Sequence, residues 1–82
     1  MKLTSDEILA AFGETLRTVL GRPVGALTCA TRPEEVDGWD SLAHIQLVLA
    51  LGARFGVKFT TQDVLAWDSV GAVVASIERK LA

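Results

Sequence analysis

Residues 37–59 read DGWDSLAHIQLVLALGARFGVKF, and this stretch decides the fold. A Ser or Asp that stands directly before a periodic apolar run is typical of a helix N-cap, and Asp40 and Ser41 hold that place here. Gly56 follows the run and is a natural left-handed stop. We therefore expect a helix that begins at or near Asp40–Ser41 and ends at about Phe55.

The expected helix carries two apolar stripes. Successive residues are turned by roughly 100°, so the apolar side chains divide into two sets displaced by well over a quarter turn. The first set is Leu47, Val48, Leu51 and Phe55, and the second is Leu42, Ile45 and Leu49. In a small bundle one stripe serves the core, which leaves the other for a partner, a ligand or a second core contact. His44 groups with the first stripe, so we expect a partly buried structural histidine in preference to one that senses pH or binds phosphate.

A second long helix is expected before this one. Thr4 and Glu7 have the spacing of a capping box, and apolar residues then recur at helical spacing up to Gly21. From Arg22 to Asp40 no period is sustained, and prolines and glycines interrupt the chain. Because a loop of this length in so small a protein is either disordered or functional, and because it carries apolar residues, we expect an ordered, functional loop.

Two more helices are expected after Gly56. Residues 57–59 read as a short extended piece, and Thr60 or Thr61 can cap a brief helix that runs through about Ala66.

The last helix is expected to start at Asp68 or Ser69, because apolar residues recur at helical spacing from Val70 to Leu81. The predicted fold is all-α: a small helical bundle of three main helices plus one short helix, with a long ordered loop between the first and second helices. A chain of 82 residues makes one small domain, so we expect a single domain over residues 1–82.

Composition and charge exclude several classes of protein. Half of the residues are apolar, yet no apolar run approaches the roughly 20 residues that span a bilayer. The N-terminus has no apolar stretch typical of an export signal, so we expect a cytoplasmic protein. The net charge of −2 argues against binding to nucleic acid. A DNA-reading helix would also need basic or amide residues where this sequence is mostly aliphatic.

The sequence offers no catalytic or metal-binding group. Cys29 is the only cysteine, which excludes an internal disulfide and leaves no second thiol to complete a zinc site. We expect it to be a small buried or loop residue. No triad, metal cluster or carboxylate pair is evident, so we assign no catalytic residue and no metal ligand.

Two Trp-Asp-Ser-aliphatic tetrapeptides, WDSL at residues 39–42 and WDSV at residues 67–70, stand before apolar runs. Capping alone explains Ser69 well. Ser41 differs because it follows an acidic stretch, residues 1–40, with four Lys or Arg against seven Asp or Glu (4 − 7 = −3). A hydroxyl at a helix start is also well placed to carry a phosphate, since the exposed N–H groups and the helix dipole favour an anion there. Only Ser41 therefore has the setting of an attachment site.

Residues 37–59, with TTQDVLAWDSVGAVVASI at 60–77, resemble the acyl carrier proteins, and the likeness extends more loosely over the whole chain. In that family an Asp-Ser-Leu motif before the second helix carries 4′-phosphopantetheine on its serine. The resemblance implies that Ser41, between Asp40 and Leu42, is modified and that Ser69 is not.

The resemblance also implies partners and a role. A phosphopantetheinyl transferase would move the arm from coenzyme A to the serine with Mg²⁺. An acyl- or aminoacyl-loading enzyme would then place a thioester on the arm's thiol, and a synthase or transferase would use it. The protein itself would be a monomeric carrier and not an enzyme.

The second helix departs from the pattern of fatty acid carriers, which typically line it with Asp and Glu. The matching positions here are Ala43, Gln46, Gly52, Ala53 and Arg54, and no carboxylate occurs between Ser41 and Gln62. We therefore expect partner docking through the apolar side of this helix, by Leu42, Ile45, Gln46 and Leu49. We also expect a dedicated pathway for a polyketide, non-ribosomal peptide, modified lipid or sugar-linked acyl unit.

The resemblance suggests where an acyl chain would lie. The expected pocket lining is Leu51, Phe55, Phe59 and Trp67. A Trp in that wall would leave less room than other carriers have, so we expect short or polar acyl groups to be carried mostly outside the bundle. Trp39 is expected to anchor the loop beneath Ser41.

Two alternatives remain at this point. The first is an aminoacyl or peptidyl carrier of the same fold. The second, from another class, is an unmodified helical protein–protein interaction module, in which Ser41 is only a cap. In that module Ser41→Ala would lose roughly 1 kcal/mol of capping and change nothing else.

Overall fold

The structure is a computed structural model that describes residues 3–81. Over these residues the chain forms four α-helices and one short 3-10 helix and no strand, which confirms the predicted all-α class. The helices are α1 (Ser5–Leu20), η1 (Pro33–Glu35), α2 (Ser41–Phe55), α3 (Thr61–Leu65) and α4 (Val70–Leu81). None of them is long and apolar enough to cross a membrane.

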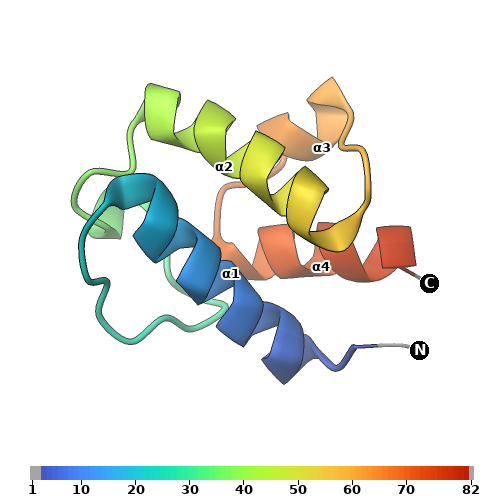
Figure 1. The fold of residues 1–82 in the computed structure, drawn as a ribbon, viewed down its shortest axis with the longest axis horizontal. Coiled ribbons are helices and arrows are strands. Elements are labelled where there is room, and N and C mark those ends of the chain that lie inside the picture. The colour runs from blue at the N-terminus through green and yellow to red at the C-terminus, as the bar shows by residue number, and fades with distance from the viewer. Residues whose placement is uncertain (1–2, 82) are drawn as a thin grey trace.

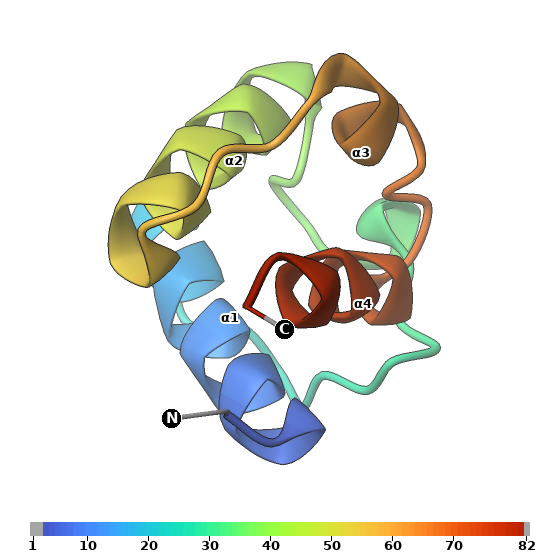
Figure 2. The same ribbon diagram turned by 90° about the vertical axis from the view of Figure 1, so that its right-hand side faces the viewer.

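The helices surround one common interior. Helix α1 packs against both α2 and α4 (Figure 1). In the end view of Figure 2, α1 and α4 lie on one side of the interior and α2 and α3 on the other. The start of α1 and the end of α4 are joined by a hydrogen bond of 3.0 Å from Ser5 Oγ to Glu78 Oε2.

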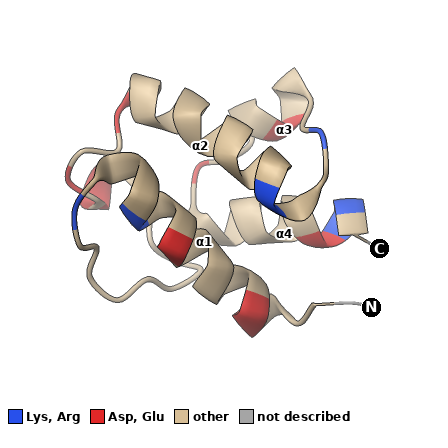
Figure 3. Cartoon of the chain, viewed as in Figure 1, with Lys and Arg blue, Asp and Glu red and all other residues tan. Residues whose placement is uncertain are grey.

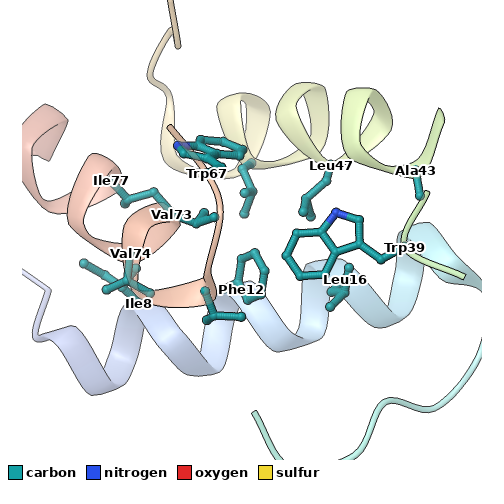
Figure 4. Packing of buried hydrophobic residues seen from close by; sticks show 12 residues of the cluster. Ile8, Phe12, Leu16, Trp39, Ala43, Leu47, Trp67, Val73, Val74 and Ile77 are labelled. Atoms are coloured by element: carbon teal, nitrogen blue, oxygen red, sulfur yellow. The ribbon is translucent and has the colours of Figure 1, made fainter. Parts of the chain in front are cut away.

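The core is filled by side chains from all three main helices and by two tryptophans from the connections (Figure 4). Its members are Ile8, Phe12, Leu16, Trp39, Ala43, Leu47, Leu51, Trp67, Val70, Val73, Val74 and Ile77. Burying one large apolar side chain stabilises a fold by about 1.5–3 kcal/mol. Trp39 contacts Phe12 of α1 with ring centroids 5.8 Å apart, so it holds the end of the long loop beneath α2, as expected.

The helix ends follow the signals in the sequence. The Thr4 hydroxyl accepts from Glu7 N, and the Glu7 carboxylate accepts from Thr4 N, which completes the predicted capping box. Helices α1 and α2 end at Gly21 and Gly56, whose φ angles of 68° and 65° lie in the left-handed region that glycine adopts without strain. The predicted boundaries of these two helices are therefore confirmed.

The long loop is held against the start of α4, as an ordered loop must be. The N–H groups of Val70 and Gly71 donate to the carbonyl oxygens of Thr31 and Cys29, at 2.8 and 2.9 Å. These bonds satisfy two N–H groups of the first turn that no helical carbonyl can reach. Cys29 itself is exposed in this loop. The 3-10 helix was not predicted from the sequence, although Pro33 at its first position is a usual start signal.

Candidate functional site

The two Trp-Asp-Ser tetrapeptides use their polar residues differently. Before α2 the cap is Asp40, whose Oδ1 accepts from Ala43 N at 2.8 Å. Ser41 is the first helical residue, its side chain is exposed, and its hydroxyl forms no hydrogen bond within residues 3–81. Before α4 the cap is the serine, because Ser69 Oγ accepts from Ala72 N at 3.2 Å. The suggestion that Ser41 is only a cap is therefore wrong, whereas the cap predicted for Ser69 is confirmed.

The start of α2 leaves the Ser41 hydroxyl in a setting that suits a phosphate. The N–H of Ala43 is taken by Asp40 Oδ1 and that of His44 by the Asp40 carbonyl, at 2.8 and 2.9 Å. The N–H groups of Ser41 and Leu42 have no partner within the described part of the chain. Exposed N–H groups at a helix start, together with the helix dipole, stabilise a negative charge there.

Ser41 lines an open groove of about 610 Å³ between the start of α2 and α3. Its walls come from α2, α3, η1 and the two tryptophan segments: Pro33, Glu34, Trp39, Asp40, Ser41, His44, Ile45, Val64, Leu65 and Trp67. Most of these side chains are apolar, so the groove suits a chain with apolar groups that is attached at the serine. The groove continues onto α3, whose Val64 and Leu65 the sequence did not indicate as site residues.

His44 lies in the floor of this groove and is half-buried, as expected. Its imidazole lies beside the Trp39 ring, with ring centroids 6.1 Å apart and the ring planes 21° apart, and it meets the Trp67 ring edge-on at 5.7 Å. Trp39 Nε1 donates to His44 Nδ1 at 3.1 Å. The indole N–H of Trp67 does not bind His44 and donates instead to Ser76 Oγ, at 3.0 Å.

The second stripe of α2 lies on the surface. Leu42, Ile45 and Leu49 are 65%, 58% and 70% exposed, and Gln46 beside them is also exposed. Exposed large aliphatic side chains that adjoin one another commonly mark a binding surface. One further exposed leucine lies nearby and was not predicted from the sequence. It is Leu65 of α3, which is 80% exposed and also lines the groove. Its short helix carries no periodic signal from which this exposure could be predicted.

Helix α2 carries one charged side chain, Arg54, near its C-terminal end (Figure 3). From the sequence, five positions of this helix were matched with the acidic positions of fatty acid carriers, and two of the five are not open surface. Ala43 is only 6% exposed and packs in the core. At Gly52 a Cβ atom would lie 3.0 Å from the carbonyl oxygen of Val57. Gln46, Ala53 and Arg54 remain as exposed positions without a carboxylate.

The four residues expected to line an acyl pocket are spread over two environments. Leu51 is fully buried in the core, and Phe55 packs partly buried against it. Trp67 lines the groove beside Ser41, and Phe59 meets its ring edge-on with centroids 4.9 Å apart. Trp67 and Phe59 therefore belong to the side of the molecule that faces the groove, while Leu51 belongs to the closed interior.

The acidic groups with shifted pKa values lie outside the groove. The Thr60 N–H, together with Lys80, lowers the pKa of Asp63 to about 2. The Thr4 N–H lowers the pKa of Glu7 in the same kind of capping box. Both shifts follow from hydrogen bonds that favour the charged carboxylate, so they belong to helix capping. Within residues 3–81 no three His, Cys, Asp or Glu side chains gather as a metal site would require.

Comparison with known proteins identifies the family that this chain is similar to. The family model described as "Phosphopantetheine attachment site" matches residues 10–77. The chain is 32% identical over 77 residues to the acyl carrier protein MbtL of Mycobacterium sp. (strain MCS), covering 94% of this chain and 86% of that protein. It is 31% identical over 83 residues to the meromycolate extension acyl carrier protein of Mycobacterium tuberculosis (strain ATCC 25618 / H37Rv), covering 96% and 69%.

The fold also matches a solved structure. The solution NMR structure of a holo acyl carrier protein from Geobacter metallireducens superimposes with a TM-score of 0.83 at 28% sequence identity. The match covers 90% of this chain and 85% of that one.

Proposed function

Because this chain belongs to the phosphopantetheine-binding acyl carrier protein family, we propose that Ser41 is the residue that carries its 4′-phosphopantetheine. Members of this family are carriers and not enzymes. One observation supports the assignment above the others: Asp40 caps α2, so the exposed Ser41 hydroxyl is free of any structural hydrogen bond within residues 3–81.

The residues around Ser41 fit the prosthetic group. The helix start offers unpaired N–H groups for its phosphate, and the groove offers apolar walls, among them Ile45, Val64 and Leu65, for its pantetheine part. The bound group supplies a terminal thiol that holds an acyl chain as a thioester. The protein contributes attachment, a surface for docking and a high local concentration of the tethered cargo. A phosphopantetheinyl transferase and acyl-handling enzymes are the partners that the family implies.

Intact-protein mass tests the attachment. The parent protein is incubated with coenzyme A, Mg²⁺ and a broad-specificity phosphopantetheinyl transferase, and we expect the mass to rise by one phosphopantetheine. Ser41→Ala should gain nothing. The matched control is Ser5→Ala, because Ser5 is likewise the exposed first residue of a long helix, and this variant should load like the parent. A folded parent that gains no mass with several transferases would leave the unmodified interaction module as the better account.

We further propose that the carrier serves a dedicated pathway and not housekeeping fatty acid synthesis. The support is the surface of α2, where Gln46, Ala53 and Arg54 are exposed at positions that are acidic in typical fatty acid carriers, and where the exposed side chains of Leu42, Ile45 and Leu49 lie beside them. Complementary charge controls encounter rate and partner choice, so an enzyme with a basic docking patch would meet this helix slowly. Two of the relatives are also named as particular carriers, the acyl carrier protein MbtL and the meromycolate extension acyl carrier protein.

A change of charge on α2 tests this second proposal. Gln46 and Ala53 are exposed, so Gln46→Glu with Ala53→Glu adds two carboxylates to the docking side without disturbing the core. We expect the activity of a fatty acid ketosynthase and a malonyl transferase on this variant to rise about tenfold or more at low salt, and less at high salt. Ala10→Glu with Thr18→Glu on α1 is the control with the same net charge and should leave activity unchanged. Equal activity on all three proteins would contradict the charge argument.

A further inference from the structure

The imidazole of His44 is in contact with two aromatic rings. The Trp39 ring lies beside it with the two ring planes 21° apart, and the Trp67 ring meets it at 71°. Both tryptophans are nearly inaccessible, at 7% and 3% exposed, so they cannot move aside without opening the core. The ring of His44 therefore has a fixed orientation in the floor of the groove.

Trp39 also decides which nitrogen of this imidazole carries the proton. An indole N–H can only donate, and Trp39 Nε1 donates to His44 Nδ1 at 3.1 Å. A nitrogen that accepts a hydrogen bond holds no proton, so the neutral ring carries its proton on Nε2. Trp39 thereby makes Nε2 a hydrogen-bond donor.

This donor is free and accessible. Nε2 forms no hydrogen bond within residues 3–81. No buried side-chain nitrogen or oxygen in the same range lacks a partner, so Nε2 is not a buried atom. His44 and Ser41 line the same groove, and residues three apart on a helix are neighbours on its surface.

Every other side-chain donor of the groove is already engaged. Trp39 Nε1 binds His44, Trp67 Nε1 binds Ser76, and the Ser41 hydroxyl is the proposed attachment point. The groove also contains two carboxylates. Asp40 uses its Oδ1 for the helix cap, and the Glu34 carboxylate is paired with Arg32 Nε at 3.0 Å. An anion attached beside Asp40 would therefore find one uncommitted side-chain donor in the groove, the Nε2–H of His44.

We propose that His44 is a positioning residue that donates its Nε2–H to a phosphodiester oxygen of the arm carried by Ser41. The inference rests on the proposed attachment at Ser41. The hydrogen bond fixes the first atoms of the arm over the aromatic floor and so directs the remainder along the groove toward Val64 and Leu65. Trp39 acts through His44, because without its indole N–H the imidazole proton could move to Nδ1.

Nitrogen-15 NMR of the imidazole tests the proposal on the whole protein. Long-range ¹H–¹⁵N spectra of the apo protein should show Nδ1 as a bare nitrogen and Nε2 as N–H. Conversion to the holo form should shift the Nε2 signal while leaving Nδ1 as the bare acceptor. Identical Nε2 signals in the apo and holo forms would overturn the proposal.

Two substitutions separate positioning from packing. His44→Asn keeps an acceptor for Trp39 Nε1 but has no donor at the place of Nε2, whereas His44→Gln keeps a donor at that distance along the side chain. The ³¹P signal of the holo phosphodiester should therefore shift in His44→Asn and return toward the parent position in His44→Gln. A purely structural histidine predicts equal ³¹P signals in all three proteins, or equal displacement in both variants, and either result would overturn the proposal.

Failure of this inference is distinguishable from failure of the proposed function. A protein that gains no phosphopantetheine mass gives no holo form and removes both. A protein that gains the mass and keeps its Nε2 and ³¹P signals unchanged is a carrier in which His44 only packs.

Discussion

Asp40 and Ser41 are adjacent, both belong to residue types that cap helices, and only one of them does so here. Asp40 accepts from Ala43 N, and its extended backbone leaves Ser41 as the first helical residue. The sequence predicted the helix start but could not choose between the two side chains, because the choice depends on one residue's backbone angles. The same pattern before α4 gives the opposite result, with Ser69 as the cap.

This division of roles predicts different stability effects for the two residues. Asp40→Ala should lower the free energy of unfolding by about 1 kcal/mol, because Ala43 N loses its hydrogen bond. Ser41→Ala should change it by less than about 0.5 kcal/mol, as for other surface substitutions. Urea denaturation measures both, and Ser69→Ala is the positive control for a lost serine cap, at about 1 kcal/mol. A loss in Ser41→Ala equal to that in Asp40→Ala would contradict the assignment.

At the level of an element, the periodicity of α2 divided its large apolar side chains into two sets without deciding which one is buried; in the structure the set with Leu47 and Leu51 packs in the core and the set with Leu42 is exposed. The periodicity did not place Ala43, which is buried in the core. Alanine adds little to an apolar pattern, yet Ala43 stands four and eight residues before Leu47 and Leu51, in one row of the helix. That spacing was the available signal. The groove lining from α3 had no comparable signal, because a helix of five residues is too short to show a period.

The docking of the long loop on α4 could not be predicted from the sequence, because it uses backbone atoms. Gly71 shows how close the contact is: a Cβ atom there would lie 2.9 Å from the Cys29 carbonyl oxygen and 3.1 Å from its Cβ. Any side chain at this position would push the loop away from the helix. The glycine therefore has a packing role within α4, where alanine would otherwise favour the helix by about 1 kcal/mol.

We predict that Gly71→Ala lowers stability despite that gain, because the overlap is with backbone and overpacking typically costs about 1–3 kcal/mol. Gly13→Ala in α1 is the matched control. Its Cβ would lie 3.6 Å from Leu27 and 3.7 Å from Arg17, which is ordinary contact, so this variant should gain up to about 1 kcal/mol. Thermal unfolding of the two variants should shift in opposite directions. An increase for both would show that the loop adjusts freely.

At the scale of the whole molecule, α3 is tied to α4 by one acidic side chain. Asp63 accepts from Thr60 N in the α3 capping box and pairs with Lys80 Nζ at 3.0 Å. The pKa of Asp63 is lowered from 3.8 to about 2, mainly by the hydrogen bond from the Thr60 N–H and to a smaller extent by the one from Lys80. Glu7 at the start of α1 has its pKa lowered in the same direction by Thr4.

This pKa shift sets the direction of an acid effect. A carboxylate whose pKa is lower in the folded protein contributes stability above its unfolded pKa, and that contribution is lost as the pH falls through the folded pKa. For Asp63 the loss lies between about pH 4 and about pH 2. We expect the parent to be more stable than Asp63→Asn at pH 5 and the difference to shrink toward pH 2, measured by urea denaturation. A difference that stays constant down to pH 2 would contradict this account.

The arrangement of the whole molecule separates a closed core from an open groove, and all of the proposed chemistry lies in the groove. The most direct test is to find the atom that receives the prosthetic group. The protein is loaded under reducing conditions, which remove any coenzyme A disulfide on the exposed Cys29. Tryptic cleavage after Arg17 and Arg54 then releases residues 18–54, because Arg22 and Arg32 each precede a proline and are not cleaved. Ser41 is the one serine in that fragment. Tandem mass spectrometry should place the whole added mass on Ser41, and added mass on any other residue would contradict the central claim.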